Sequence, residues 1–177
     1  MDLNNKTAVI TGGAGGIGSA LARALAKQGT NVVVSDLNLE AAQKVAEEVG
    51  GIAVACDVTD EAQIKALIAA AEEAYNQVDI FVSNAGFAAA EPDHVASASN
   101  EVWQLNWDVH VMAHVYASRD LLPKMIKRGD GYLVNVASAA GLLAQISDAA
   151  YSATKHAAVS LADSLNIAHT DQGVKVS

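Results

Sequence analysis

Five short runs rich in Val and Ile, separated by longer amphipathic stretches, constrain the fold of this chain more than any other feature. The runs are Lys6–Thr11, Asn31–Ser35, Ile52–Cys56, Asp79–Ser83 and Gly131–Ala137. Short continuous apolar runs are typical of strands that are buried on both faces. The stretches between them carry apolar residues at helical spacing, as Ile17, Leu21 and Leu25 do. Because strand–helix alternation builds right-handed crossovers, we predict an α/β fold: a doubly wound parallel sheet in three α/β/α layers.

Two longer helices are predicted in the second half of the chain, over Asn100–Lys127 and Tyr151–Thr170. Pro123 lies late in the first helix and is expected to kink it, because proline removes a helical hydrogen bond. Gly173–Ser177 has the pattern of the opening of a sixth strand. The chain has 177 residues without a visible linker or repeat, so the sequence predicts a single domain over residues 1–177.

Composition excludes several classes of protein. Hydrophobic residues make up 51% of the chain, which is too many for intrinsic disorder. The net charge of −9 opposes binding to nucleic acid, because phosphates require a basic surface. The single cysteine, Cys56, cannot form an internal disulfide, and the sequence has neither a signal-peptide pattern nor an apolar span of membrane length. We therefore predict an acidic cytoplasmic protein with no nucleic-acid or membrane partner.

A glycine-rich turn joins the first predicted strand to the first helix. It fits G-x-G-x-x-G at Gly13, Gly15 and Gly18, and it also fits T-G-x-x-x-G-x-G. A sharp turn needs residues that tolerate positive φ, and residues without Cβ let a pyrophosphate approach the free N–H groups of the helix. A merely flexible loop is the alternative, which the strand–turn–helix context disfavours. The candidate phosphate-binding residues are Thr11, Gly12, Gly15, Gly16, Ile17 and Gly18.

Asp36, followed by Leu37, closes the second predicted strand 20 residues after Gly16. A dinucleotide site places a carboxylate at this point to accept hydrogen bonds from the adenosine ribose. A carboxylate repels a 2′-phosphate, and residues 12–22 and 35–43 contain no Lys or Arg to attract one. The sequence therefore favours NAD over NADP as the cofactor, with Leu37 beside it. The alternative use of Asp36 is as a helix N-cap.

Tyr151 and Lys155 lie four residues apart, which places them on one face of a helix. An ammonium group beside a phenol favours the phenolate, so the phenol can act as a general acid or base. Ser138 follows the fifth predicted strand, at the edge of the sheet where ligands of open α/β folds bind. Taken alone, Y-x-x-x-K is also common on partly exposed helix faces.

Taken together, these segments resemble the short-chain dehydrogenase/reductase family, of the type with a T-G-x-x-x-G-x-G turn. The segments that match, in the order of the family, are Thr11–Gly18, Asp36, Cys56-Asp57-Val58, Asn84-Ala85-Gly86, Ser138 and Tyr151–Lys155. The resemblance covers essentially the whole chain. It implies a Rossmann fold, reversible hydride transfer between a nicotinamide and a carbonyl or secondary alcohol, and a homo-oligomer.

The resemblance also implies roles for individual residues. Tyr151 is the general acid/base, Lys155 stabilises its phenolate and binds the nicotinamide ribose, and Ser138 orients the substrate oxygen. Asn84, Ala85 and Gly86 line the adenosine-ribose side, while Asp57 and Val58 frame the adenine. An alternative for Asp57 is capping the next helix, for which Thr59 and Asp60 compete.

The chain departs from the family pattern at two places. Where the family has a D-V-N-like run, whose asparagine holds a water of the proton relay, this chain has Asp108-Val109-His110. We expect His110 in the relay position, with an added pH dependence near its usual pKa of about 6.5, and Asn106 as partial compensation. Relatives continue beyond Ser177 through further strands and a substrate-covering segment, so the resemblance implies a C-terminally truncated chain, either a fragment of a longer protein or a naturally shortened form. His110 and His114 lack the Glu of a zinc motif, and no metal site is expected.

The leading hypothesis is an NAD-dependent oxidoreductase that interconverts a secondary alcohol and a carbonyl. The apolar residues 141–145, with Phe87 and Ala88, suggest a moderately hydrophobic substrate. A non-catalytic NAD(H)-binding fragment or pseudoenzyme is the alternative from another class. Epimerisation or dehydration on a related fold is a third.

Overall fold

The computed structural model describes residues 2–89, 93–144 and 148–177. Within these residues, six strands form one parallel sheet in the order β3-β2-β1-β4-β5-β6. The strands are β1 (Thr7–Thr11), β2 (Asn31–Asp36), β3 (Ile52–Ala55), β4 (Ile80–Ser83), β5 (Gly131–Asn135) and β6 (Val174–Val176). This arrangement confirms the predicted doubly wound Rossmann-type sheet, and β6 confirms the sixth strand expected near the end of the sequence.

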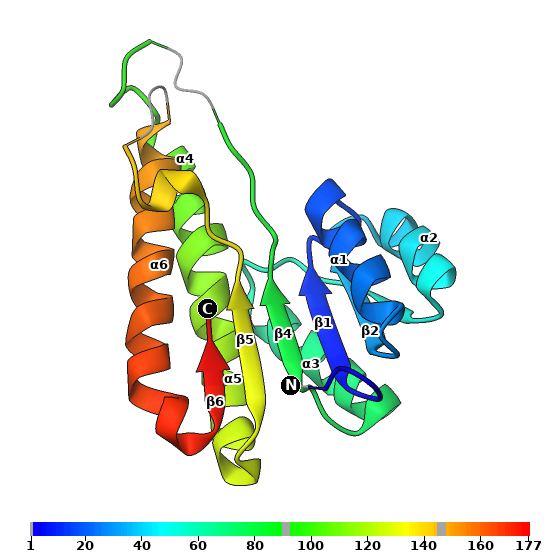
Figure 1. The fold of residues 1–177 in the computed structure, drawn as a ribbon. Coiled ribbons are helices and arrows are strands. Elements are labelled where there is room, and N and C mark those ends of the chain that lie inside the picture. The colour runs from blue at the N-terminus through cyan, green and yellow to red at the C-terminus, as the bar shows by residue number, and fades with distance from the viewer. Residues whose placement is uncertain (1, 90–92, 145–147) are drawn as a thin grey trace.

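Helices cover both faces of the sheet (Figure 1). They are α1 (Gly16–Ala26), α2 (Leu39–Val49), α3 (Glu61–Tyr75), α4 (Asn100–Trp107), α5 (Ala113–Arg128) and α6 (Ala149–His169). Short 3-10 turns, η2 (Ala139–Gly141) and η3 (Thr170–Gln172), flank α6. None of the helices in the described ranges is long and apolar enough to cross a membrane.

The alternation of side chains along each strand creates two apolar cores, one on each face. Val9 and Val33 point to the face packed by α3, α5 and α6. Ile10 and Val34, their neighbours in sequence, point to the face packed by α1 and α2. Because both faces are covered, the strands consist of continuous apolar runs without polar alternation.

The segment predicted as one helix over 100–127 is interrupted. Between α4 and α5, residues Asp108–Met112 form a turn of π-helix, η1. The helix continues past Pro123 to Arg128, so the departure from α-helical geometry lies at Asp108–Met112, well before the proline. π-helical turns occur frequently at functional sites, and this one contains His110.

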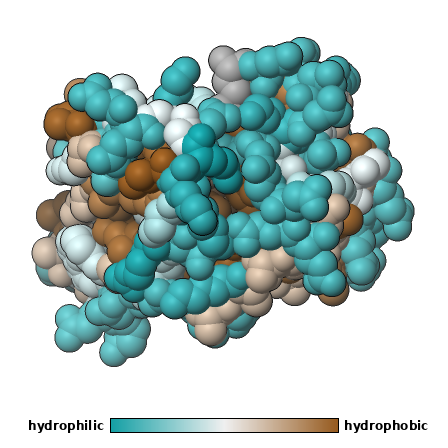
Figure 2. Space-filling view, turned by 90° about the horizontal axis from the view of Figure 1, so that it is seen from below, coloured by the Kyte–Doolittle hydropathy of each residue, from teal (hydrophilic) through white to brown (hydrophobic). Residues whose placement is uncertain are grey.

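A charged network ties the amino ends of three strands together. Lys6 Nζ lies 2.8 Å from Asp130 Oδ2 and 3.5 Å from Asp79 Oδ1. The other oxygen of Asp79, which is buried, accepts a hydrogen bond from the Thr7 backbone N–H at 2.9 Å. The surface seen from this end of the sheet is mostly hydrophilic, with apolar groups gathered toward one side (Figure 2). In open α/β sheets, ligands bind at the opposite, carboxyl ends of the strands.

Candidate active site

The glycine-rich turn is shaped by close backbone contacts at two of its glycines. Gly12 has φ +60°, a left-handed conformation that favours glycine. A Cβ on Gly18 would lie 2.3 Å from the Gly12 carbonyl oxygen, so no other residue fits there without movement. Gly16, by contrast, has no atom within 4 Å of a Cβ position, and its open side faces a cavity that it lines. The first two glycines build the turn, and the third leaves room for a ligand.

Asn84 holds the turn against the end of β4. Its side-chain Nδ2 donates to the carbonyl oxygens of Thr11 at 2.9 Å and Gly12 at 3.1 Å. In return, Thr11 Oγ1 accepts hydrogen bonds from the backbone N–H groups of Asn84 and Ala85. Thr11 itself is buried and positions the turn without lining the cavity. The glycine-rich turn and the Asn84-Ala85-Gly86 segment therefore form one hydrogen-bonded unit at the carboxyl ends of β1 and β4.

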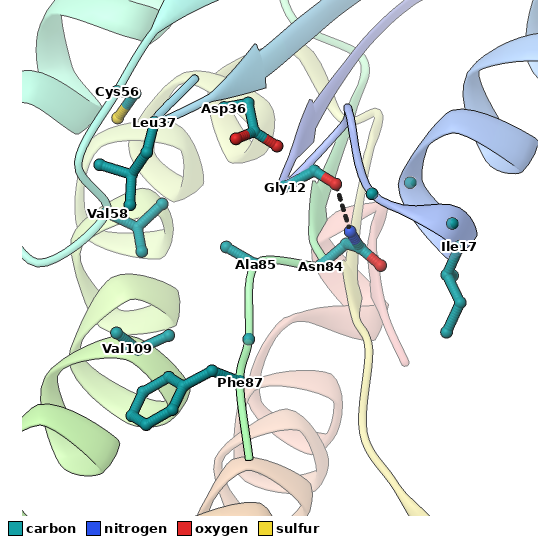
Figure 3. Close-up of a pocket in the computed structure, with 14 residues that line it drawn as sticks. Gly12, Ile17, Asp36, Leu37, Cys56, Val58, Asn84, Ala85, Phe87 and Val109 are labelled. Carbon is teal, nitrogen blue, oxygen red and sulfur yellow. Dashed lines mark hydrogen bonds between the residues drawn. The ribbon is translucent and has the colours of Figure 1, made fainter. Parts of the chain in front are cut away.

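A cavity of about 530 Å³ lies over this unit (Figure 3). It is lined by Gly12, Gly15, Gly16, Ile17, Gly18, Asp36, Leu37, Cys56, Val58, Asn84, Ala85, Gly86, Phe87 and Val109. The N-terminus of α1, with its free N–H groups, opens at one side of it. Eleven of these fourteen residues are among those predicted from the sequence to hold a cofactor, and Cys56, Phe87 and Val109 are not.

Asp36 presents its carboxylate to the cavity from the end of β2 (Figure 3). Its Oδ2 accepts a hydrogen bond from the Ala14 N–H and its Oδ1 from the Asn38 N–H, both at 3.1 Å. Asn38, whose side chain accepts from Ala41, is the N-cap of α2. Asp36 is therefore not the cap, and the two bonds fix its charge between the glycine-rich turn and Leu37.

Asp57 does not line the cavity, although it was predicted to reach the adenine. Its Oδ1 accepts hydrogen bonds from both the N–H and the Oγ1 of Thr59. Asp60 is the N-cap of α3. Cys56, one residue earlier, lines the cavity instead, and burial raises the pKa of its thiol to about 11. The alternation of side chains explains the difference, because neighbouring residues of an extended chain point in opposite directions.

Tyr151 and Lys155 lie on the first turns of α6, close to each other and to the end of β5. Lys155 Nζ is 5.7 Å from the centroid of the Tyr151 ring and donates to the Val136 carbonyl oxygen at 2.7 Å. Burial lowers the pKa of Lys155 to about 8. Asp148 caps this helix through the Tyr151 N–H and also accepts from the Ala89 N–H, which joins α6 to the segment after β4.

Ser138 lies in the turn that follows β5, and its Oγ accepts a hydrogen bond from the Ala140 N–H. This turn packs directly on α6. Ser152 Oγ donates to the Ala140 carbonyl oxygen at 3.0 Å, and a Cβ on Gly141 would lie 2.8 Å from the Lys155 carbonyl oxygen. Ser138, Tyr151 and Lys155 are thus held at one end of the sheet by α6. Of the apolar wall predicted over residues 141–145, residue 145 lies outside the described residues; Leu142 and Leu143 are exposed.

Comparison with known proteins identifies the family. The sequence profile of the short chain dehydrogenases matches residues 6–177. This chain belongs to the short-chain dehydrogenase/reductase family. It is 36% identical over 179 residues to the cyclohexanol dehydrogenase of Acinetobacter sp. (strain SE19), covering 98% of this chain and 71% of that protein. It is 34% identical over 180 residues to the sorbitol dehydrogenase of Cereibacter sphaeroides, covering 100% of this chain and 70% of that protein.

The fold of a solved member of the family superimposes on the whole chain. That structure is a short chain dehydrogenase/reductase from Burkholderia phymatum in complex with NAD, with a TM-score of 0.94 and 33% sequence identity. The match covers 100% of this chain and 65% of the other, so the chain spans less than two thirds of the length of that relative.

His110, in the π-helical turn, contacts Phe87, Tyr151 and Thr154. Its ring stacks on Phe87 at 5.3 Å and meets Tyr151 edge-on at 5.2 Å. The Phe87 N–H donates to Nε2 at 3.2 Å, and Nδ1 lies 3.2 Å from Thr154 Oγ1. A backbone N–H can only donate, so Nε2 carries no proton and the neutral ring donates from Nδ1 to Thr154. Both ring nitrogens are therefore used by the protein.

The expected titration of His110 is corrected by its burial, whereas its place in a proton relay stays a prediction. Its two ring nitrogens are bonded to Phe87 and Thr154, so neither is left for a relay water. Burial, and after it the charge of Lys155, lower the pKa of His110 to about 4, so it does not titrate near 6.5. Asn106 is buried as well, and its Nδ2 donates to the Val102 carbonyl of its own helix. The side chain of His110 thus connects Phe87 with Thr154 of α6.

Because the pKa of His110 is lowered, we expect His110 to make the stability of the fold depend on pH, and not the rate of catalysis. The pKa of His110 is lower in the folded chain than in the unfolded chain. Below about pH 6.5 the unfolded chain therefore binds a proton at His110 that the folded chain does not bind. Stability is therefore lost as the pH falls from about 6.5 to 4. Urea unfolding should show that wild type loses about 2 to 3 kcal/mol more than His110→Asn between pH 7 and 4.5. This prediction would be contradicted if wild type and His110→Asn lost the same free energy of unfolding over this pH range. It would also be contradicted if the variant had a different pH–rate profile between pH 6 and 8.

Proposed function

We propose that this protein is an NAD-dependent oxidoreductase that interconverts a secondary alcohol and a carbonyl. One observation carries the proposal: a glycine-lined cavity that begins at the Asp36 carboxylate reaches Phe87, whose neighbour His110 contacts Tyr151. Ser138, Tyr151 and Lys155 do not line this cavity themselves, and Tyr151 is linked to it through His110 and Phe87. The NAD complex of the Burkholderia protein and the dehydrogenase names of two relatives support the same reading.

The residues of the cavity fit a dinucleotide. The space over Gly16 is open because glycine has no side chain. This space lies beside the N-terminus of α1, which suits the negative charge of a pyrophosphate. Asp36, held by two backbone N–H groups, suits the ribose hydroxyls. Leu37, Val58 and the backbone at Ala85 would flank the adenosine. NAD, when bound, supplies the hydride acceptor for the alcohol carbon or, when reduced, the hydride donor for the carbonyl.

Tyr151 moves the proton in this proposal. In alcohol oxidation its Oη takes the proton from the substrate hydroxyl, and in carbonyl reduction it returns that proton to the oxygen. Lys155 lies beside the ring, and its ammonium stabilises the phenolate that forms. Lys155 is 3% exposed, so its charge is poorly solvated and acts more strongly on a neighbouring anion.

Ser138 and the π-helical turn position the other groups. Ser138 orients the substrate oxygen through its hydroxyl hydrogen, since its Oγ already accepts from the Ala140 N–H. His110 fixes Phe87, which forms a wall of the cavity, against the helix that carries Tyr151. Phe87, together with the exposed Leu142 and Leu143 after Ser138, supports a moderately hydrophobic substrate.

Asp36 is expected to determine the choice between the two nicotinamide cofactors. In Asp36→Asn the charge is lost while the amide oxygen can still accept a backbone hydrogen bond. The preference for NADH over NADPH should fall by about ten-fold or more, because repulsion of the 2′-phosphate disappears. Fluorescence titration with each cofactor measures this ratio. Asp60→Asn is the matched control, since asparagine also caps a helix and Asp60 lies outside the cavity; an equal ratio in both variants would contradict the role of Asp36.

The proposed function is tested by supplying NAD⁺ and a panel of secondary alcohols that includes cyclohexanol. Formation of NADH with at least one alcohol is expected. Saturable NADH binding without oxidation of any alcohol would favour a non-catalytic dinucleotide-binding protein. A folded sample that binds neither NADH nor NADPH would exclude both proposals for this chain.

A further inference from the structure

Asp148 is a buried carboxylate to which the proposed function gives no role. It is 3% exposed and is the N-cap residue of α6. Its Oδ1 accepts a hydrogen bond from the Tyr151 N–H, three residues later, at 3.0 Å. Serine caps a helix about as well as aspartate does, whereas burying a carboxylate costs free energy that hydrogen bonds have to offset. Capping alone therefore does not explain an aspartate at this position.

The second oxygen of Asp148 binds a distant part of the chain. Oδ2 accepts a hydrogen bond from the Ala89 N–H, 59 residues earlier, at 3.0 Å. Ala89 belongs to the segment after β4, which at residues 84–89 is neither helix nor strand. Because a carboxylate has two acceptor oxygens, Asp148 can cap α6 and hold this segment at the same time.

The same segment is attached to α6 at a second point. The Phe87 N–H donates to His110 Nε2 at 3.2 Å, and His110 Nδ1 lies 3.2 Å from Thr154 Oγ1 of α6. Phe87 and Ala89 flank Ala88, which is exposed. The backbone is therefore held on both sides of Ala88 by side chains that also bind α6.

Residues 87–89 border the reacting end of the proposed site. Phe87 lines the cavity and stacks on His110, whose ring meets Tyr151 edge-on at 5.2 Å. At the other end of the segment, Ala89 is bonded to the cap of the helix that carries Tyr151. A substrate whose oxygen meets the Tyr151 hydroxyl would therefore lie against residues 87–89.

We infer that the Asp148 carboxylate clamps residues 87–89 beside Tyr151 and is a positioning residue that determines substrate specificity. It fixes the separation between this wall and the helix that carries the tyrosine. A loosened wall affects a large substrate more than a small one, because the large substrate makes more of its contacts there. The clamp stands on the two hydrogen bonds alone, whereas the specificity role rests on the proposed function.

Amide hydrogen exchange followed by NMR tests the clamp without any substrate. In Asp148→Ser the shorter side chain still caps α6 but leaves the Ala89 N–H without its acceptor. The Thr7 N–H is the internal reference, because it donates to the buried Asp79 carboxylate at the other ends of the strands. The ratio of the Ala89 rate to the Thr7 rate should be at least about ten-fold higher in the variant than in wild type. An unchanged ratio, or an Ala89 N–H that wild type does not protect, would overturn the clamp.

A large and a small alcohol test the specificity role. The probes are cyclohexanol and isopropanol, or the largest and smallest alcohols of the panel that the wild-type chain oxidises. The ratio of their kcat/KM values does not depend on the fraction of folded enzyme. In Asp148→Ser this ratio should fall by about ten-fold, a change of the size that one methylene group in an apolar pocket produces.

Asp60→Ser is the matched control for this variant. Asp60 is the N-cap residue of α3, lies outside the cavity and is also replaced by a residue that caps well. Its ratio of kcat/KM values should stay within about two-fold of wild type. Equal ratios in Asp148→Ser and Asp60→Ser would overturn the specificity role.

These measurements separate the two proposals. A chain that shows the exchange difference at Ala89 but oxidises no alcohol contradicts the proposed function and the specificity role, and leaves the clamp supported. An active chain whose alcohol ratio is unchanged in Asp148→Ser overturns the specificity role and leaves the proposed function standing.

Discussion

Replacing Tyr151 with phenylalanine is expected to lower kcat by about a thousand-fold, because the variant loses the group that exchanges a proton with the substrate oxygen. The ring itself is retained, so its edge-on contact with His110 and its place beside Lys155 persist. The Kd for NADH should therefore stay within about two-fold of the wild-type value. Steady-state oxidation of the best alcohol of the panel and a fluorescence titration give the two numbers.

Tyr116→Phe is the matched control for this change. Tyr116 lies on α5, packs against the apolar core and faces the Arg119 guanidinium, away from the cavity. Its loss of a hydroxyl should leave kcat within about two-fold of wild type. If the two variants had similar kcat values, Tyr151 would not be the acid–base residue.

Gly18→Ala is expected to abolish tight cofactor binding, with a loss of about a hundred-fold in NADH affinity. The added Cβ would meet the Gly12 carbonyl oxygen at 2.3 Å and Asn84 Nδ2 at 2.8 Å. The Gly12 backbone and the Asn84 side chain are hydrogen-bonded to each other and line the cavity, so the turn has to open. Overpacking of this kind also costs about 1 to 3 kcal/mol of stability. Urea unfolding and NADH titration measure the two effects.

Gly16→Ala provides the comparison within the same turn. No atom lies within 4 Å of the new Cβ, and Gly16 is the first residue of α1. Alanine there should leave the stability unchanged or raise it by about 0.5 kcal/mol. A Gly18→Ala protein as stable as Gly16→Ala, and equal to wild type in NADH affinity, would contradict the description of the turn.

Much of the fold could be predicted because its signals are local. Continuous apolar runs predict parallel strands that are buried on both faces. In β1, for example, the adjacent residues Val9 and Ile10 point into different cores, so both must be apolar. The glycine-rich turn was likewise predictable, because a strand, a turn and a helix follow one another directly. The π-helical turn at Asp108–Met112 was not, since no single residue type marks it and the pattern of apolar residues runs through it.

The finer features of the site depend on tertiary contacts that the sequence does not display. Whether Asp57 or Cys56 faces the cavity is decided by the direction of one backbone segment after β3. The tautomer of His110 is set by the Phe87 N–H, 23 residues earlier, and by Thr154, 44 residues later. Its low pKa follows from burial, which motif matching does not report. The sequence motif therefore singled out His110, but it could not predict the low pKa of its ring or the partners of its ring nitrogens.

We propose that this chain transfers a hydride between a nicotinamide and a secondary alcohol carbon. The most direct measurement uses cyclohexanol carrying deuterium at the alcohol carbon, with NAD⁺ as acceptor, and mass spectrometry of the NADH formed. We expect the NADH to carry the deuterium, and we expect the Tyr151→Phe protein to form almost no NADH. NADH without the label, or no NADH from a folded protein that binds the cofactor and is offered the full alcohol panel, would contradict it.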